Sequence, residues 1–140
     1  MISNSLCCRF SAAHKLYNPK WSKEQNSEVF GACANENFHG HNFELIVSVI
    51  GTPDPETGIV ISTARLSDLL YSEVIEQVDH KNLNLDVPFM KDKMTSCENL
   101  IVEFWGILAP KITEISPNAV LHKLRLYETP RNFVEYYGNE

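Results

Sequence analysis

The stretch from His39 to Ile50 alternates with a period of two, and this feature limits the fold more than any other. Its odd positions are His39, His41, Phe43, Leu45, Val47 and Val49. Side chains two residues apart share one face of a strand, so the pattern predicts a long strand with one apolar face. The same period recurs from Leu6 to His14 and from Val120 to Glu128. The fold is therefore expected to contain a sheet with one buried face.

Two segments after this strand have helical periodicity instead. One apolar stripe consists of Leu66, Leu69, Leu70, Val74 and Val78, and the other of Leu100, Ile101, Phe104, Trp105, Leu108 and Ile112. Thr95-Ser96-Cys97-Glu98 precedes the second stripe and predicts a capping box with Thr95 as N-cap. The segment from Tyr17 to Phe38 has no steady period, which predicts an excursion carrying at most a short helix.

Turn signals complete the order of elements. Pro53 to Gly58 reads as a turn, and Pro130-Arg131-Asn132 separates the last long strand from a final one, Phe133 to Tyr137. The order strand, strand, helix, helix, strand, strand predicts an α+β fold with helices on one face of an antiparallel sheet. The 140 residues suit a single domain, 1–140. Two open sheet edges would favour an oligomer.

The composition excludes several classes of protein. Asp+Glu 18 against Lys+Arg 12 gives a net charge of −6, which argues against binding of nucleic acid by a basic face. No signal peptide is recognisable, and no stretch approaches the roughly 18 apolar residues of a membrane helix. The cysteines, Cys7, Cys8, Cys33 and Cys97, form no C-x-x-C pair. These features predict a cytoplasmic protein with free thiols and no membrane partner.

Three histidines form the first candidate site. His39 and His41 point to the same side of their strand, and His14 ends a neighbouring strand on the face of Phe10 and Ala12. Three neutral imidazoles and an open position describe a catalytic zinc site. The alternative is three half-buried histidines, each hydrogen-bonded to a backbone carbonyl.

Two further features could take part in proton transfer. Cys33 lies in a loop before His39, where it could be a fourth zinc ligand, a base or nucleophile, or a small buried residue. Asp79-His80 follows the first helical segment, and a carboxylate can orient an imidazole as a proton carrier if the two residues lie in a turn. The alternative for this pair is a polar helix terminus.

Glu128 shares a strand face with Leu124 and Leu126, and a carboxylate on an apolar face is expected to be paired or functional. It could accept two parallel hydrogen bonds from adjacent N–H groups of a ligand. The alternative is a glutamate that reaches water from the end of its strand.

Together these motifs resemble the 6-pyruvoyl-tetrahydropterin synthase family, which includes the 6-carboxy-tetrahydropterin synthases of queuosine biosynthesis. The resemblance spans Phe10 to Gly138. It rests on Phe10-Ser11-Ala12-Ala13-His14, on Cys33 separated by five residues from His39-Gly40-His41-Asn42, on Asp54-Pro55-Glu56-Thr57-Gly58, on Asp79-His80-Lys81-Asn82-Leu83, and on Tyr127-Glu128-Thr129.

The resemblance implies a fold and a set of roles. The fold would be the tunnelling fold, a four-stranded antiparallel sheet with two helices that trimerises into a barrel and stacks into a hexamer. The implied roles are one zinc per chain on His14, His39 and His41, a catalytic Cys33, a proton relay of Asp79 and His80, a pterin anchor at Glu128, and a second pterin-contacting stretch at Ser96, Cys97 and Glu98. Cys97 stands where the family usually has threonine, so its contact with the pterin would be retained only if the backbone makes it. Glu98 could instead complete the capping box.

The implied substrate is 7,8-dihydroneopterin triphosphate, with zinc as a Lewis acid on the side-chain hydroxyls. The five-residue gap between Cys33 and His39 favours the pyruvoyl branch, a lyase reaction that eliminates triphosphate. The alternative is the 6-carboxy-tetrahydropterin synthase of queuosine biosynthesis on the same substrate. A zinc-holding scaffold without turnover is a third hypothesis, disfavoured by the presence of Cys33 and of Asp79-His80. Lys15, Lys81 and Arg131 are candidates for the triphosphate, and the alternative for each is a solvated charge.

Overall fold

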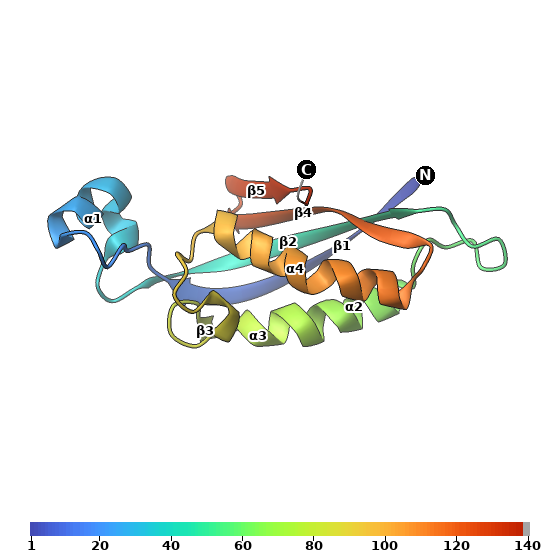
Figure 1. Cartoon of the computed structure of the whole chain (residues 1–140), viewed down its shortest axis with the longest axis horizontal. Coiled ribbons are helices and arrows are strands. Elements are labelled where there is room, and N and C mark those ends of the chain that lie inside the picture. The colour runs from blue at the N-terminus through green and yellow to red at the C-terminus, as the bar shows by residue number, and fades with distance from the viewer. Residues whose placement is uncertain (139–140) are drawn as a thin grey trace.

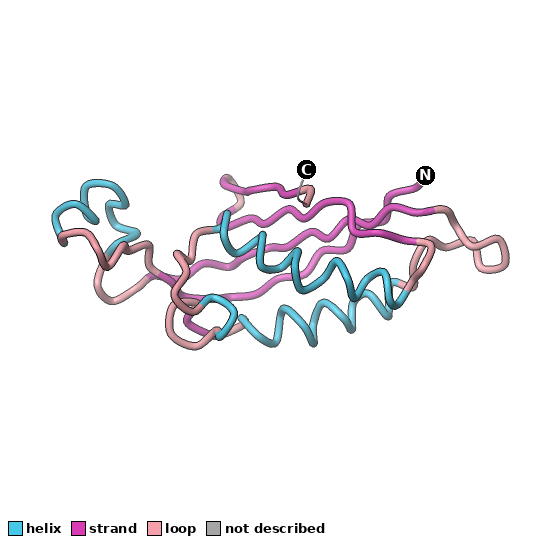
Figure 2. Tube along the Cα trace, viewed as in Figure 1, coloured by secondary structure: helices cyan, strands magenta, loops and turns pink. Residues whose placement is uncertain are grey.

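A computed structural model describes residues 1–138 of the chain (Figures 1 and 2). Its sheet has the strand order β3-β1-β2-β4-β5. The long strands are β1 (Ile2–His14), β2 (His39–Gly51) and β4 (Ala119–Thr129), and the shorter ones are β3 (Lys81–Asn82) and β5 (Asn132–Tyr136). Neighbouring strands are antiparallel except β1 and β3. The predicted α+β class and the C-terminal hairpin are confirmed.

The two predicted helical segments pack on one face of this sheet, as expected (Figure 1). They are α4 (Cys97–Ile115) and a second rod, in which α2 (Thr63–Leu70) continues through a π-helical turn (Tyr71–Ile75) into α3 (Glu76–Val78). In the two predicted stripes only Leu69 and Trp105 are less than fully buried. From the sheet, the stacked rings of Phe10 and Phe43, with centroids 4.8 Å apart, belong to the same core.

The expected four-stranded antiparallel sheet is wrong in one respect, because β3 adds a fifth, parallel strand. The backbone N–H of His80 donates to the carbonyl of Ser11, and that of Leu83 donates to the carbonyl of Ala13. These bonds hold the chain against the edge of β1 after it leaves α3. A strand of two residues is too short to leave a period in the sequence.

The start of α4 also differs from the prediction, because Ser96 rather than Thr95 is the N-cap. The Ser96 hydroxyl accepts a hydrogen bond from the Asn99 N–H at 3.2 Å. The Thr95 hydroxyl is instead directed inward, within hydrogen-bonding distance of the Lys15 carbonyl (3.2 Å) and of Asn84 Oδ1 (3.1 Å). Thr95 and Ser96 both carry a hydroxyl that could cap the helix. Because Thr95 is buried and its hydroxyl is directed inward, Ser96 is the cap.

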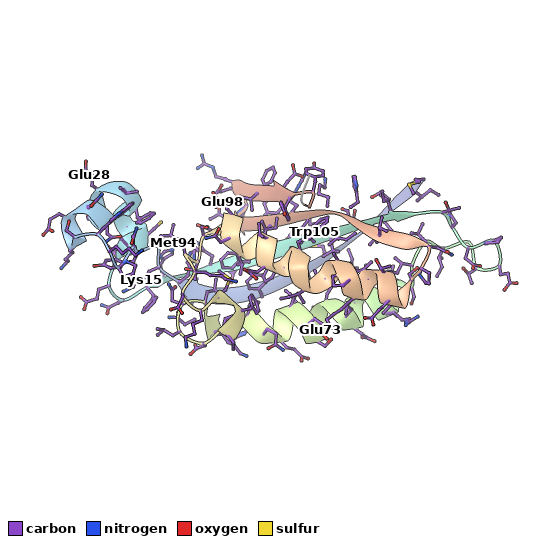
Figure 3. All side chains as sticks on the ribbon, in the orientation of Figure 1. Lys15, Glu28, Glu73, Met94, Glu98 and Trp105 are labelled. Atoms are coloured by element: carbon purple, nitrogen blue, oxygen red, sulfur yellow. The ribbon has the colours of Figure 1, made fainter. Side chains whose placement is uncertain are left out.

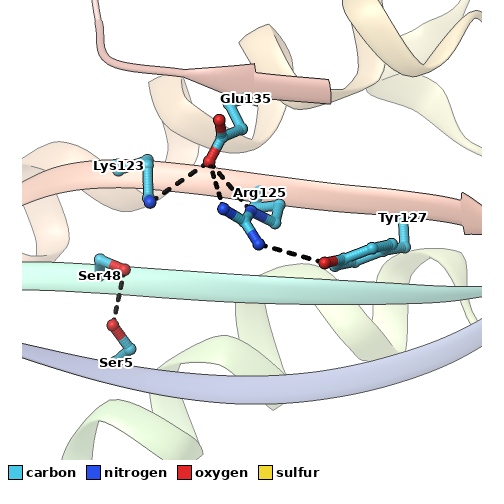
Figure 4. A network of polar contacts seen from close by, with 6 residues as sticks. All are labelled: Ser5, Ser48, Lys123, Arg125, Tyr127 and Glu135. Atoms are coloured by element: carbon cyan, nitrogen blue, oxygen red, sulfur yellow. Dashed lines mark hydrogen bonds and ion pairs between the residues drawn. The ribbon is translucent and has the colours of Figure 1, made fainter. Parts of the chain in front are cut away.

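The sheet face away from the helices is polar (Figure 4). On it, Arg125 Nε–H donates to Glu135 Oε2 at 2.9 Å, and Lys123 lies 3.3 Å from the same oxygen. The hydroxyls of Ser5 and Ser48 are hydrogen-bonded at 2.7 Å. One side of the sheet therefore holds the core, and the other presents charged and hydroxyl groups.

The excursion between β1 and β2 forms a small lobe at one end of the sheet (Figure 1). It contains α1 (Lys23–Phe30), followed by a 3-10 turn (Gly31–Ala34) that carries Cys33. The fully buried Asn26 folds the lobe, because its side-chain amide bonds both the N–H and the carbonyl of Asn18. A short helix here agrees with the prediction. In the described part of the chain, no helix has the length and apolar character needed to span a membrane.

Candidate metal and ligand site

The register of β1 and β2 brings the three predicted histidines together. His14 pairs with His39, and His41 lies opposite Ala12, so all three side chains are on the core face. Their ring centroids are 4.6 Å apart for His14 and His39, 4.8 Å for His39 and His41, and 5.3 Å for His14 and His41. One nitrogen from each ring lies within 4.8 Å of the others, which places three imidazole donors around one point.

These nitrogens lack partners inside the protein. Among residues 1–138, His14 Nε2, both ring nitrogens of His39, and His41 Nε2 are buried without a hydrogen bond. Buried polar atoms are nearly always paired, so unpaired ones indicate a partner from outside the chain, such as an ion. The alternative of three carbonyl-bonded histidines therefore fails for His39. The donor set, three nitrogens of neutral rings, fits zinc.

The buried backbone of Thr95 orients His14. His14 Nδ1 lies 2.8 Å from the Thr95 carbonyl oxygen, and a carbonyl can only accept, so Nδ1 carries the proton. The lone pair is then on Nε2, which faces His39 and His41. Burial lowers the pKa of His14 and of His39, which favours the neutral form that binds metal. Sequence reasoning missed this role of Thr95, because a backbone carbonyl leaves no trace in a pattern of side chains.

Glu128 lies beside the imidazoles, between His41 and Cys97. Its Oε1 is 3.2 Å from His41 Nε2, without the geometry of a hydrogen bond. Its Oε2 accepts a hydrogen bond from the Cys97 thiol at 3.1 Å. The Glu128 side chain is 18% exposed, so it does not simply extend into water from the end of its strand.

The other two residues of the second predicted stretch lie at the start of α4. The Ser96 hydroxyl is engaged as the N-cap of that helix. Glu98 is exposed in the first helical turn (Figure 3). Neither has a contact with the imidazoles or with Glu128 among the hydrogen bonds and ion pairs of the described residues. Their predicted contact with a ligand remains a prediction.

Cys33 is close in the chain to the histidines but does not join their cluster. Its carbonyl accepts a hydrogen bond from the Leu16 N–H at 2.8 Å, which ties the 3-10 turn to the segment after His14. Its side chain is half-buried. Within residues 1–138, the group of converging donor atoms contains the three histidines and no sulfur. This arrangement disfavours Cys33 as a fourth ligand.

Asp79 and His80 lie in a turn with their side chains in contact, which is the condition for a joint role in proton transfer. His80 has φ of 60°, and its Nδ1 is 2.9 Å from Asp79 Oδ2. The other carboxylate oxygen accepts the Ser11 N–H at 2.8 Å, and this hydrogen bond lowers the pKa of Asp79. The His80 ring is 82% exposed at the β1 edge. Within the described residues, the pair is tied to Ser11 and has no hydrogen bond or ion pair to the histidine cluster.

The chain is similar to known proteins along most of its length. A family model described as "6-pyruvoyl tetrahydropterin synthase" matches residues 5–139. The 6-pyruvoyl tetrahydrobiopterin synthase of Homo sapiens is 40% identical over 129 residues, covering 92% of this chain and 86% of that protein. The 6-carboxy-5,6,7,8-tetrahydropterin synthase of Rickettsia conorii is 28% identical over 150 residues, covering 96% and 99%. The solved structure of Caenorhabditis elegans 6-pyruvoyl tetrahydropterin synthase is 38% identical, with a TM-score of 0.85 and coverage of 99% and 96%.

Proposed function

The chain belongs to the 6-pyruvoyl tetrahydropterin synthase family, and on this basis we propose that it is a zinc-dependent lyase acting on 7,8-dihydroneopterin triphosphate. The observation that carries the proposal is the cluster of buried, unpaired imidazole nitrogens with a carboxylate beside it. His14, His39 and His41 would hold the zinc, one per chain. When bound, zinc supplies Lewis acidity toward the side-chain hydroxyls of the substrate.

The chain's own groups would bind the substrate and move its protons. Glu128 would accept hydrogen bonds from adjacent N–H groups of the pterin ring, as a carboxylate can do with two oxygens. Cys33 is held beside the segment after His14 and would remove and return a proton on the side chain of the substrate. Asp79 would orient the imidazole of His80, which would carry a second proton. In the pyruvoyl reaction, triphosphate then leaves and the hydroxyl carbons become carbonyls by internal redox.

Mass spectrometry of the product formed from 7,8-dihydroneopterin triphosphate tests the proposed reaction. A 6-pyruvoyl product with free triphosphate would support it. A 6-carboxy product would assign the chain to the queuosine branch, which the relative from Rickettsia conorii keeps as the second candidate. An unchanged substrate in the presence of stoichiometric zinc would favour the scaffold without turnover.

Glu128→Gln is expected to raise the Michaelis constant by about 10–100-fold, because a buried polar group without its charged partner costs roughly 1–3 kcal/mol. Zinc content is expected to stay at one per chain, since Glu128 is not among the converging donors. Calorimetric titration with 7,8-dihydroneopterin and metal analysis of the same sample provide the measurement. An unaltered affinity would show that Glu128 is not the anchor.

The order of groups along the sheet supports an assignment of the triphosphate to Lys15. Glu128 follows Tyr127, which pairs with Glu44, so the anchor lies at the level of Phe43. His41 and His39 come next along β2, and Phe38 and Lys15 lie beyond them. From Phe43 to Phe38 the chain spans about 16 Å at about 3.3 Å per residue. The spatial order of Glu128, the histidines and Lys15 along the sheet therefore matches the order of pterin ring, hydroxyls and phosphates in the substrate.

The surroundings of Lys15 hold its ammonium group in place. Asn84 bonds both the N–H and the carbonyl of Lys15 at 2.9 and 3.2 Å. The Lys15 Nζ lies 4.9 Å from the ring centre of Phe38 and 5.2 Å from that of Tyr17, and Figure 3 shows the residue between the sheet and the lobe. Phe38 has φ of 67°, a strained conformation for a bulky residue that is retained where surroundings require it. No carboxylate pairs with Lys15 among residues 1–138, so its charge is available to an anion.

Lys15→Gln is expected to raise the Michaelis constant for the triphosphate substrate by about tenfold or more, the size of one hydrogen bond to a charged group. Affinity for 7,8-dihydroneopterin, which lacks the phosphates, is expected to stay within about twofold. Lys111→Gln is the matched control, since Lys111 on α4 lies 3.8 Å from Glu73 and away from the site. Equal losses for the phosphorylated and dephosphorylated ligands would contradict the assignment.

We also propose that the chain assembles through its sheet edges into a barrel, as a trimer and then a hexamer. The strands β5 and β3 are the outer strands of the sheet within the described residues, and outer strands favour edge-to-edge pairing. In a ring of identical subunits, opposite edges of neighbouring copies meet. The exposed Asp79-His80 pair at the β1 edge would then face the β4–β5 side of the next copy, which is the side that carries Glu128.

A further inference from the structure

Cys97 and Glu128 form a contact that the roles assigned so far do not explain. Cys97 is the first residue of α4 and is 5% exposed, and its sulfur lies 3.1 Å from Glu128 Oε2. We infer that Cys97 is a positioning residue, whose thiol S–H holds one oxygen of Glu128 and aims the carboxylate at the N–H groups of a bound pterin. The inference rests on the proposed function and extends it to a residue that does not itself touch the ligand.

The direction of the hydrogen bond follows from the chemistry of the pair. An ionised carboxylate has no proton to give, so the thiol must be the donor. Burial raises the pKa of Cys97, and the negative charge of Glu128 raises it further, so the sulfur keeps its proton under ordinary conditions. Cys97 therefore differs from a reactive cysteine, because its function requires the protonated form.

The contact limits the freedom of a side chain with several rotatable bonds. Glu128 is the residue before the last of β4, and its two oxygens have different neighbours, Cys97 on Oε2 and His41 on Oε1. His41 Nε2 has no hydrogen bond with Oε1, so the Cys97 thiol is the one hydrogen-bond donor to the Glu128 carboxylate among the described residues. With Oε2 fixed by the thiol, Oε1 and the remaining lone pair of Oε2 can accept two parallel N–H groups. Such a pair is the recognition pattern of an aminopyrimidinone ring.

Binding of 7,8-dihydroneopterin to Cys97 variants tests the inference. Cys97→Ala is expected to raise the dissociation constant about 10–150-fold, the range for loss of one hydrogen bond to a charged acceptor. Cys97→Ser keeps a donor and is expected to remain within about threefold of the native chain. Turnover at saturating substrate is expected to change by less than about twofold in both variants, because the contact acts on binding. Cys8→Ala is the matched control, since Cys8 is equally buried but donates to the Leu45 carbonyl instead.

A double-mutant cycle separates positioning from direct contact. In a Glu128→Ala background, which has no acceptor left, Cys97→Ala is expected to have no further effect on pterin affinity. An equal loss in both backgrounds would mean that Cys97 contacts the ligand or only fills space, and the inference would be wrong. The same conclusion would follow if Cys97→Ser failed to restore the affinity lost in Cys97→Ala.

The S–H stretching band gives a second measurement that needs no ligand. The band of Cys97 is identified by its loss in Cys97→Ser, and it is expected to move to higher frequency in Glu128→Ala, where the acceptor is gone. A band unchanged by Glu128→Ala would overturn the inference even if binding in that variant is too weak to measure. If the native chain binds no pterin at all, the proposed function fails, whereas the infrared shift still decides whether the thiol holds Glu128.

Discussion

Replacement of His39 or His41 by alanine is expected to remove most of the zinc from the purified protein and to abolish turnover. Each variant leaves two imidazoles around the centre, and two such ligands hold zinc far less well than three. Neither ring nitrogen of His39 has a hydrogen bond within residues 1–138, so its replacement by alanine removes no hydrogen bond from the protein. Loss of metal should therefore occur without loss of the fold, and circular dichroism together with elemental analysis gives the measurement.

His122→Ala is the matched control for this prediction. His122 is an exposed histidine on β4, and its ring packs 5.9 Å from that of Tyr137, away from the cluster. This variant is expected to keep one zinc per chain. Chelation of the native protein followed by addition of zinc should remove and restore activity together. Stoichiometric zinc in both His39→Ala and His41→Ala would show that the three imidazoles are not the ligand set.

The strands and the face of each histidine could be predicted from the sequence, because a period of two fixes which side chains share a side. What the period alone does not determine is the register between strands. The pairing of His14 with His39 depends on the β1–β2 alignment, whereas the sequence indicates only that His14 ends a neighbouring strand and could supply a third imidazole. The parallel β3 was missed because backbone bonds to Ser11 and Ala13, not side-chain periodicity, hold it in place.

The less predictable parts of the site involve backbone groups and long-range contacts. Thr95 was interpreted as a helix cap from its local sequence, whereas its position is decided by His14 and Lys15, which are far away in the chain. The contact of Cys97 with Glu128 joins α4 to β4 and has no local signature. For Asp79 and His80 the sequence indicates only that their side chains can meet if the two residues lie in a turn, and the contact with Ser11 at the β1 edge depends on the fold.

Cys33→Ala is expected to lower turnover by about 10²–10⁴-fold, the usual contribution of a general acid or base. Zinc content, circular dichroism and substrate affinity are expected to stay close to those of the native chain, because no sulfur joins the three imidazoles within the described residues. Single-turnover kinetics and metal analysis of one preparation provide the test. Loss of zinc together with activity would make Cys33 a ligand, and retained activity would make it a packing residue.

Alkylation of the native protein also tests whether Cys33 acts on the substrate. Cys8 and Cys97 are buried, so Cys7 is the only other cysteine of the described chain that a reagent can readily reach. If exposure alone governed the reaction, Cys7 would react before the half-buried Cys33. However, burial and a hydrogen bond with Glu44 raise the pKa of Cys7, which keeps it in the less nucleophilic thiol form. We therefore expect Cys33 to react first and 7,8-dihydroneopterin triphosphate to protect it, with Cys7→Ala as a control of unchanged turnover. Faster labelling of Cys7, or labelling of Cys33 that substrate does not slow, would contradict a role for Cys33 at the reacting carbon.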